Sequence, residues 1–340
     1  MTYQQVLENA RTCIGPYCKA CNDCNGKVCR NTMPGPGAKG EGTGFIRNAE
    51  KWREICVNMD TICENSQVDT SFTLFGRTFE IPAFAAPVGA MRLHYGDKYD
   101  DLTYNDILVR ACANAGILAF TGDGTDPKVV EGAAEALKAN GGCGVPTVKP
   151  WNLETIRQKM DLVKAADPCA IAMDIDAAGL PFLKGLNPPA GSKTVDQLKE
   201  IAAMAGKPFI LKGIMTVRGA EKAVEAGAAA IVVSNHGGRV LPGSAATADV
   251  LPEIADAVGD RVKILVDGGI RSGTDIFRAL ALGADAVMIC RPFLISYYGG
   301  GTEGIVTYVE KLRAELTDAM YMCGARSLGD ITRDMVRELR

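Results

Sequence analysis

Histidine is scarce in this chain: His94 and His236 are the only two among 340 residues. Long apolar runs are missing too, since no stretch reaches the roughly 18 residues of a membrane-spanning helix and the N-terminal stretch lacks the apolar core of a secretion signal. There is no excess of one charge, because 37 Lys and Arg residues stand against 40 Asp and Glu residues. These absences argue against nucleic acid or a membrane as the partner, and we expect a cytoplasmic protein.

A repeated alternation of short apolar runs and longer amphipathic stretches begins at residue 83, which is the pattern of parallel βα units. Eight runs can be counted, the number that closes a (β/α)8 TIM barrel; an open doubly wound sheet is the alternative. Ahead of them, "TSFTLFGRTFEIPAF" predicts a hairpin that turns at Gly76 and Arg77. The runs are residues 84–89, 117–122, 144–149, 170–175, 209–214, 230–235, 263–268 and 286–291.

The C-terminal ends of the eight runs are where a barrel of this kind forms its active site. Those ends carry polar and charged side chains, which are costly to hold near an apolar core without a purpose. We therefore expect the functional residues of this protein to lie there. The side chains in question are those of Thr121, Asp123, Lys149, Asp174, Asp176, Lys212, His236, Arg239, Asp267 and Arg291.

Four sequence blocks carry a resemblance to a known family. They are "LFGRTFEIPAFAAPVGAM", "ILKGIMT", "VVSNHGGR" and "VDGGIRSGTDIFRALALGADAVMICRP", and with their spacing they account for residues 68–340. On these motifs the chain resembles the FMN-dependent 2-hydroxy-acid oxidases and dehydrogenases, such as glycolate oxidase and lactate oxidase. The resemblance implies oxidation of a small 2-hydroxy acid to the 2-oxo acid, with electrons passing from the flavin to oxygen or to a carrier. It also implies a homo-oligomer, which is a tetramer in this family.

The resemblance further implies an FMN site at the strand ends. Lys212 matches the cation near N1 and O2 of the flavin, where a positive charge favours reduction of the ring. The phosphate is expected after the seventh and eighth strands, where glycines let backbone N–H groups approach and arginines supply charge. The residues so assigned to the cofactor are Ala86, Pro87, Val88, Thr121, Thr147, Lys212, Ser234, Asp267, Gly268, Gly269, Arg271 and Arg291.

The histidine of "VVSNHGGR" gains a role from the same resemblance. His236 matches the base that takes a proton from the substrate, and Asp176 matches the aspartate that pairs with it and stabilises the imidazolium. Arg239 matches the arginine that binds the substrate carboxylate with a bidentate fork. The alternative for His236 is a purely structural role, as the residue that caps the sixth strand. His94 lies on a polar stretch and receives no chemical role.

The chain departs from the family at several positions near the substrate. Leu183 stands where a second carboxylate-binding arginine is expected, and Lys184 can substitute only in part, because an ammonium group is not a bidentate fork. Lys149 replaces a tyrosine, and Asp174 replaces a threonine expected near the flavin. If these two side chains face each other, they form an ion pair. If they do not, Lys149 binds the substrate and favours a second anionic group on it.

Residues 1–67 lie outside the repeat and are predicted to form a Cys-rich segment ahead of the barrel. Four of the 12 cysteines, Cys18, Cys21, Cys24 and Cys29, have the spacing C-x2-C-x2-C-x4-C. Such a cluster in a reducing compartment is typical of a metal site, so an iron–sulfur cluster, a zinc ion and free thiols are all candidates. The Gly/Pro-rich stretch of residues 33–48 is predicted to be a linker that can cover the active site as a lid.

Two other functions fit the same barrel. A flavin-dependent isomerase needs reduced flavin but no net oxidation. A flavoprotein that binds a ligand without turnover is compatible with the missing second arginine and with the loss of two active-site tyrosines, one replaced by Lys149 and one from an N-terminal segment that this chain replaces. The placement of Arg239 three residues after His236 favours oxidation of a hydroxy acid, because that substrate requires both a base and a group that binds a carboxylate.

Overall fold

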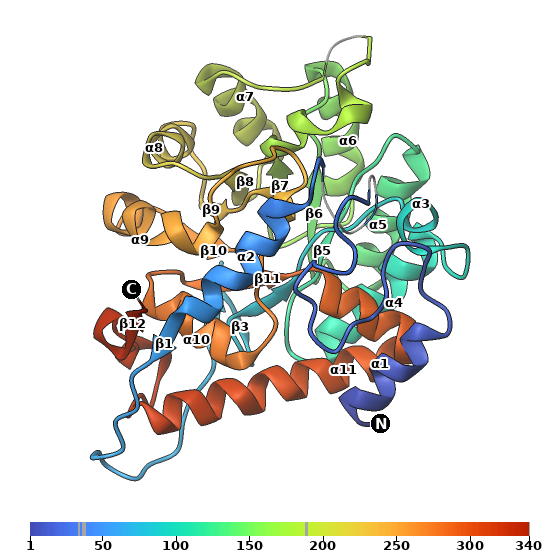
Figure 1. The fold of residues 1–340 in the computed structure, drawn as a ribbon. Helices are drawn as coiled ribbons and strands as arrows, with labels where there is room; N and C mark the ends of the chain where they lie inside the picture. The colour runs from blue at the N-terminus through green and yellow to red at the C-terminus, as the bar shows by residue number, and fades with distance from the viewer. Residues whose placement is uncertain (33–34, 36–38, 188–189, 340) are drawn as a thin grey trace.

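The computed structural model describes residues 1–32, 35, 39–187 and 190–339 (Figure 1). Its centre is a sheet of eight parallel strands in the order β4-β11-β10-β9-β8-β7-β6-β5. The two outer members of this order are joined by a parallel bridge between Ala85 and Ala119, and the Ala85 N–H donates to the Leu118 carbonyl at 3.0 Å. The sheet therefore closes into the predicted barrel, and the open-sheet alternative is wrong.

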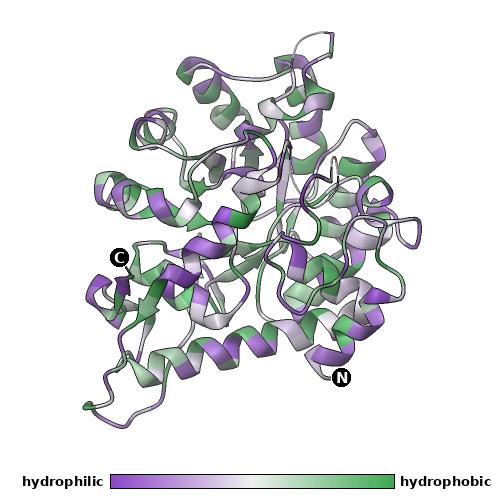
Figure 2. Ribbon diagram, in the orientation of Figure 1, coloured by the Kyte–Doolittle hydropathy of each residue, from purple (hydrophilic) through white to green (hydrophobic). Residues whose placement is uncertain are grey.

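Seven barrel strands lie within the apolar runs of the sequence, and β4 begins one residue before its run. Nearly all strand residues are buried, as expected for a parallel sheet with helices on its outside. Figure 2 shows the same layering, with hydrophobic strands at the centre and hydrophilic residues on the outer faces of the helices. The strands are β4 (Ala83–Ala85), β5 (Phe120–Thr121), β6 (Val145–Val148), β7 (Ile171–Asp174), β8 (Phe209–Ile214), β9 (Ala230–Val233), β10 (Lys263–Val266) and β11 (Ala286–Ile289).

Helices connect the strands, and side-chain caps mark where many of them begin. In α10, for example, the Ser272 hydroxyl accepts from the Asp275 N–H at 3.1 Å, which satisfies a backbone donor of the first turn. The helices that follow the strands are α3 (Met91–Tyr95), α4 (Asp101–Asn114), α5 (Pro127–Ala139), α6 (Leu153–Lys164), α7 (Val195–Ala205), α8 (Val217–Glu225), α9 (Thr247–Val258), α10 (Gly273–Ala281) and α11 (Arg291–Met322).

Short 3-10 helices form several of the connections. Two of them, η1 (Ile175–Gly179) and η2 (Pro181–Leu183), follow β7, and η3 (His236–Gly238) follows β9. The C-terminal stretch contains η4 (Leu328–Asp330), η5 (Arg333–Met335) and the strand β12 (Val336–Glu338). No helix among the described residues is long and apolar enough to cross a membrane.

The N-terminal segment packs on the barrel through α1 (Tyr3–Arg11), α2 (Thr43–Glu54) and β1 (Ile55–Val57). Helix α1 lies beside α11, where the rings of Tyr3 and Tyr308 stack with centroids 5.2 Å apart (Figure 1). Strand β1 pairs with β12 in an antiparallel register, so the stretch that follows α2 lies beside the C-terminal strand. The domain boundary between residues 67 and 68 stays a prediction.

Helix α2 corrects the predicted linker of residues 33–48. The helix begins at Thr43, and its face toward the barrel includes the buried apolar residues Phe45, Ala49 and Trp52, which recur at helical spacing. The Gly/Pro composition of the preceding stretch obscured this pattern in the sequence. Residues 33, 34 and 36–38 of the predicted lid lie outside the described residues.

The predicted hairpin is present as β2 (Phe72–Leu74) and β3 (Arg77–Phe79), with its turn one residue earlier than expected. Leu74 lies opposite Arg77, so Phe75 and Gly76 are the two turn residues, with φ angles of 49° and 77°. A two-residue turn that follows the strand twist needs positive φ at both positions, which places the glycine second.

Candidate active site

The centre of the site is a pair between His236 and Asp176. His236 begins η3 after β9, Asp176 lies in η1 after β7, and the ring Nδ1 is 3.0 Å from Asp176 Oδ1. His236 has a φ of 57°, a left-handed conformation that costs free energy for a non-glycine residue. The two loops therefore bring together the base and the carboxylate that the sequence predicted as partners.

Asp176 is a buried carboxylate that remains ionised. Burial raises its pKa, but the Lys212 ammonium and His236 lower it by more, so the pKa lies below the ordinary aspartate value. Gly213 makes room for it: with a φ of 105°, a Cβ at this residue would lie 2.5 Å from the Cβ of Asp176. Gly213, in β8, thus leaves the space that the Asp176 side chain occupies.

Lys212 is the buried cation of the site. Its Nζ donates to Ser234 Oγ at 2.8 Å and lies 3.4 Å from Asp267 Oδ2. Burial lowers the pKa of Lys212, but nearby carboxylates, Asp176 foremost, raise it by more, so the ammonium stays protonated. The Ser234 hydroxyl also accepts from the His236 N–H at 3.1 Å. One hydroxyl group therefore connects the cation to the histidine loop.

Lys149 and Asp174 form a second charged pair, on the neighbouring strand ends. Lys149 Nζ lies 3.0 Å from Asp174 Oδ2, and the two side chains are only 10% and 5% exposed. The Lys149 backbone N–H donates to Asp123 Oδ2 at 3.0 Å, and its ammonium lies 5.9 Å from the centre of the Phe182 ring. Of the two arrangements considered for Lys149, the structure contains the ion pair.

Several buried polar atoms at the strand ends have no hydrogen-bond partner among the described residues. An unpaired buried polar group costs about 1–3 kcal/mol, and native proteins contain few of them. The set includes both acceptors and donors, so a bound ligand with complementary groups would satisfy it. The atoms are Thr121 Oγ1, Thr147 Oγ1, Asp174 Oδ1, Asp176 Oδ2, Asp267 Oδ1 and Arg291 Nε.

The glycine pair after β10 lies directly beneath helix α2. Gly268 and Gly269 have φ angles of 88° and 90°, and a Cβ on Gly269 would lie 2.3 Å from the Asn48 carbonyl oxygen. The Trp52 indole N–H donates to the Gly268 carbonyl at 2.8 Å. The sequence assigned these glycines to the approach of a phosphate; the structure adds that they are needed for α2 to pack here.

Sequence reasoning missed a pair of buried amides that holds the histidine loop. Asn48 Nδ2 donates to Asn235 Oδ1 at 2.8 Å, and Asn235 Nδ2 donates back to Asn48 Oδ1 at 2.9 Å. Asn235 Oδ1 also accepts from the Gly238 N–H at 2.9 Å, and Asn48 Oδ1 accepts from the Thr247 N–H at 3.2 Å. The asparagine next to His236 in the motif was visible in the sequence, but its partner 187 residues away was not.

The three predicted arginines have different partners. Arg291 is 6% exposed, and its guanidinium stacks on Phe45 with 3.8 Å between the guanidinium carbon and the ring centre. Arg271 Nε donates to the Cys24 carbonyl at 3.0 Å, so it joins the Cys-rich segment to the barrel. Arg239 donates to the Gly35 carbonyl, and burial lowers its pKa. All three side chains contact the N-terminal segment.

The remaining predicted residues divide into two groups. Ala86 and Val88 are buried just after β4, and Gly122 permits this, because a Cβ there would lie 2.2 Å from the Val88 carbonyl oxygen. Pro87 lies between them and is half-buried. Lys184, in contrast, is exposed at the end of η2 and forms no ion pair with the described residues.

The four clustered cysteines are not arranged around a common point in the structure. In the part of the chain that the structure describes, no group of three His, Cys, Asp or Glu side chains is placed to hold an ion. Cys18 is buried, and burial raises the pKa of its thiol to about 12, whereas a metal binds the thiolate. The iron–sulfur and zinc predictions for Cys18, Cys21, Cys24 and Cys29 therefore find no support, because spacing along the chain does not by itself bring thiolates around one point.

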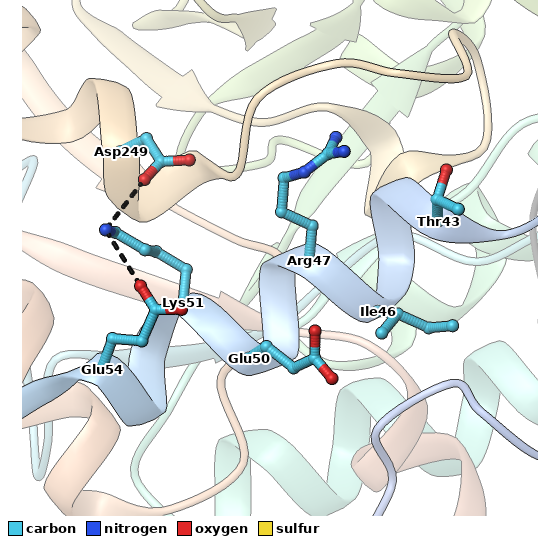
Figure 3. A pocket seen from close by; sticks show the side chains of 7 residues that line it. All are labelled: Thr43, Ile46, Arg47, Glu50, Lys51, Glu54 and Asp249. Atoms are coloured by element: carbon cyan, nitrogen blue, oxygen red, sulfur yellow. Dashed lines mark hydrogen bonds and ion pairs between the residues drawn. The ribbon is translucent and has the colours of Figure 1, made fainter.

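A separate hollow lies on the outer face of α2 (Figure 3). The Lys51 ammonium sits between Asp249 and Glu54, at 3.3 Å and 3.2 Å from their carboxylate oxygens, so its charge is already compensated. No residue predicted for the site lines this hollow, and we assign it no part in the chemistry. Its lining residues are Thr43, Ile46, Arg47, Glu50, Lys51, Glu54 and Asp249.

The fold and the site define the class: an enzyme with a (β/α)8 barrel that places a histidine–aspartate pair, cations and unpaired polar atoms at the strand ends. The model of the FMN-dependent dehydrogenase family matches residues 35–182 and 186–338. The chain therefore belongs to the FMN-dependent dehydrogenase family and is a flavin-dependent oxidoreductase. The unpaired atoms of Thr121, Thr147 and Asp267, together with Arg291, are the kind of donor and acceptor set that FMN requires.

Individual relatives agree with this assignment. A peroxisomal (S)-2-hydroxy-acid oxidase from Oryza sativa is 32% identical over 343 residues, which cover 88% of this chain and 89% of that protein. An L-lactate oxidase from Nostoc is 47% identical over 150 residues, or 44% of this chain and 40% of that protein. A solved mandelate oxidase variant with (S)-mandelic acid is similar with a TM-score of 0.78 and 26% identity, covering 99% of this chain and 97% of the other.

Proposed function

We propose that this protein oxidises a small 2-hydroxy acid to the corresponding 2-oxo acid with FMN as its cofactor. The observation that carries the proposal is the partly buried His236–Asp176 pair with the Lys212 ammonium beside it. The printed names of the relatives, L-lactate oxidase and (S)-2-hydroxy-acid oxidase, support this class of substrate. When bound, FMN supplies the two-electron acceptor that oxidation of an alcohol to a carbonyl requires.

His236 acts as the base in this proposal. Asp176 is ionised and faces ring Nδ1, so it favours the tautomer with a proton on Nδ1 and leaves the Nε2 lone pair available to the substrate. Nε2 takes a proton from the substrate, and the resulting imidazolium lies 3.0 Å from a carboxylate that stabilises its charge. The left-handed turn at His236 and the Ser234 hydroxyl hold the ring in place.

Arg239 binds the substrate carboxylate in this proposal. In the structure its guanidinium donates to the backbone carbonyl of Gly35, so the substrate takes over at least part of that contact when it binds. Lys149 and Lys184 are weaker candidates for substrate binding: Lys149 is already paired with Asp174, and Lys184 is exposed.

The strand ends hold FMN in the same proposal. Lys212 would lie near N1 and O2 of the flavin, and Asp267 would accept from the ribityl hydroxyls. Gly268, Gly269, Arg271 and Arg291 form the phosphate end, although Arg271 is also bonded to the Cys-rich segment. The flavin ring would be held by residues at the ends of β4, β5, β6 and β9, namely Ala86, Pro87, Val88, Thr121, Thr147 and Ser234. We also propose a homo-oligomeric protein, for which a sedimentation measurement is the test.

Anaerobic mixing of the FMN-loaded protein with lactate, glycolate or 2-hydroxyglutarate tests the function. We expect at least one of them to bleach the yellow absorbance and to yield one 2-oxo acid per FMN. Readmitted oxygen that restores the colour indicates an oxidase, and a requirement for an added carrier indicates a dehydrogenase. If acids of this class bind without bleaching the flavin, the protein is a ligand-binding flavoprotein and the proposal fails. Rearranged product without net oxidation identifies an isomerase.

A further inference from the structure

One buried carboxylate at the strand ends has an unpaired oxygen and no task in the mechanism above. Asp174 is the last residue of β7 and is 3% exposed. Its Oδ2 is paired with Lys149 at 3.0 Å, whereas its Oδ1 has no hydrogen-bond partner among the described residues. Asp174 forms an ion pair with Lys149, and a carboxylate in an ion pair can only accept hydrogen bonds. Oδ1 is therefore a buried acceptor that lacks a donor.

The place of Asp174 in the sheet puts this acceptor among the atoms assigned to the flavin. β7 lies between β6, which carries Thr147, and β8, which carries Lys212. Asp174 is the direct register partner of Lys212, and its charge is one of those that raise the pKa of the Lys212 ammonium. The free acceptor therefore sits beside the cation that is proposed to face N1 and O2 of the ring.

Either the flavin or the substrate can supply the donor that Asp174 Oδ1 lacks, and the chemistry of these two ligands decides between them. Oxidised isoalloxazine has a single ring N–H, at N3, next to the O2 carbonyl, and its other ring heteroatoms carry no hydrogen. The hydroxyl of the substrate is already required by His236. We infer that Asp174 Oδ1 accepts the N3–H of the flavin ring, and that the Lys149–Asp174 pair sets how readily the ring accepts electrons. The inference rests on the proposed cofactor site.

The charges around the ring predict the direction of this effect. Two ammonium groups, Lys149 and Lys212, stand against three carboxylates, Asp174, Asp176 and Asp267. Reduction builds up negative charge on the ring, so a carboxylate beside N3 opposes it and the Lys149 ammonium offsets that opposition. Removing the carboxylate alone must favour the reduced ring. Removing both members of the pair must leave the balance nearly unchanged.

The test compares FMN-loaded wild type, Asp174→Asn and the double variant Lys149→Met/Asp174→Asn in anaerobic equilibrium with a reference redox dye. Asparagine keeps the shape and an acceptor oxygen but removes the charge. We expect Asp174→Asn to raise the ratio of reduced to oxidised flavin by about tenfold or more, and the double variant to return to within about threefold of wild type. An unchanged ratio in Asp174→Asn overturns the inference, as does a double variant that behaves like the single one.

A second readout tests the hydrogen bond itself. Asp174→Ala, which has no acceptor, is expected to bind FMN about tenfold more weakly than Asp174→Asn, in keeping with the loss of one buried hydrogen bond. In the wild type reconstituted with FMN labelled with ¹⁵N at N3, the N3 proton is expected to be protected from exchange, and a freely exchanging proton contradicts the inference even if no variant folds. Bleaching of the wild type by a 2-hydroxy acid is independent of these results, so the proposed function can stand when the inference fails.

Discussion

Removal of the Asn48 side chain is the perturbation that the structure predicts most fully. Asn48 is completely buried on α2, and its amide exchanges two hydrogen bonds with Asn235, the residue that precedes His236. It also accepts from the Thr247 N–H. Asn48→Ala deletes all three hydrogen bonds at once, and it leaves the Thr247 donor buried without this partner.

The magnitude follows from these bonds. Each is worth about 1 kcal/mol net, and an orphaned buried donor adds about 1–2 kcal/mol, so the free energy of unfolding should fall by about 3–5 kcal/mol. Asn235 keeps the Ala245 carbonyl and the Gly238 N–H as partners, which limits the loss. Because the amide pair ties the histidine loop to α2, flavin reduction should slow as well, by about tenfold.

Urea unfolding of the FMN-loaded protein, followed by circular dichroism and flavin fluorescence, measures the first effect. Glu50→Ala is the matched control on the same helix: its side chain is 45% exposed and paired with Lys27, so its removal should cost less than about 1 kcal/mol. If Asn48→Ala is no less stable than Glu50→Ala, the amide pair does not fasten α2 to the histidine loop and the reasoning is refuted.

Three further outcomes are expected. Gly213→Ala forces a Cβ to within 2.5 Å of the Cβ of Asp176 and should cut the rate constant of flavin reduction at least about tenfold; an unchanged rate would show that the Asp176 position is not critical. Ser234→Ala takes an acceptor from both Lys212 and the His236 N–H, and weaker FMN binding by titration is expected, whereas unchanged binding and rate argue against this link. Because the folded pKa of Asp176 lies below its unfolded value of about 4, its contribution to stability is present above pH 4 and is lost as the pH falls through the folded pKa. Acid unfolding curves of wild type and Asp176→Asn should therefore converge at low pH, and parallel curves would contradict the assignment.

The barrel could be predicted from the sequence because each strand is a continuous apolar run that ends in polar residues. A parallel strand that is buried on both faces shows this pattern in its own sequence, so its neighbours in the sheet need not be known. Helix α2 could not be predicted in the same way, since its buried face of Phe45, Ala49 and Trp52 follows a Gly/Pro-rich stretch that reads as a linker. The hairpin turn was displaced by one residue, because composition does not say which position of the turn the glycine occupies.

The residues of the site could be predicted only where a sequence motif contains them. Resemblance paired His236 with Asp176, and the structure places them 3.0 Å apart. The alternatives for Lys149 could be stated but not decided, because a sequence contains no distance between strand ends. The Asn48–Asn235 pair spans 187 residues and leaves no local signal. The cysteine spacing suggested a metal that the described residues are not arranged to hold.

The central claim is that the strand ends aim the imidazole of His236, oriented by Asp176, at a substrate beside bound FMN. The most direct measurement is the rate constant of flavin reduction in anaerobic stopped flow, with a 2-hydroxy acid that the wild type oxidises. Wild type and His236→Asn are compared at equal FMN occupancy. The account predicts a fall of about a hundredfold or more in the variant, with FMN affinity changed by less than about threefold. A variant that reduces its flavin at the wild-type rate would contradict it.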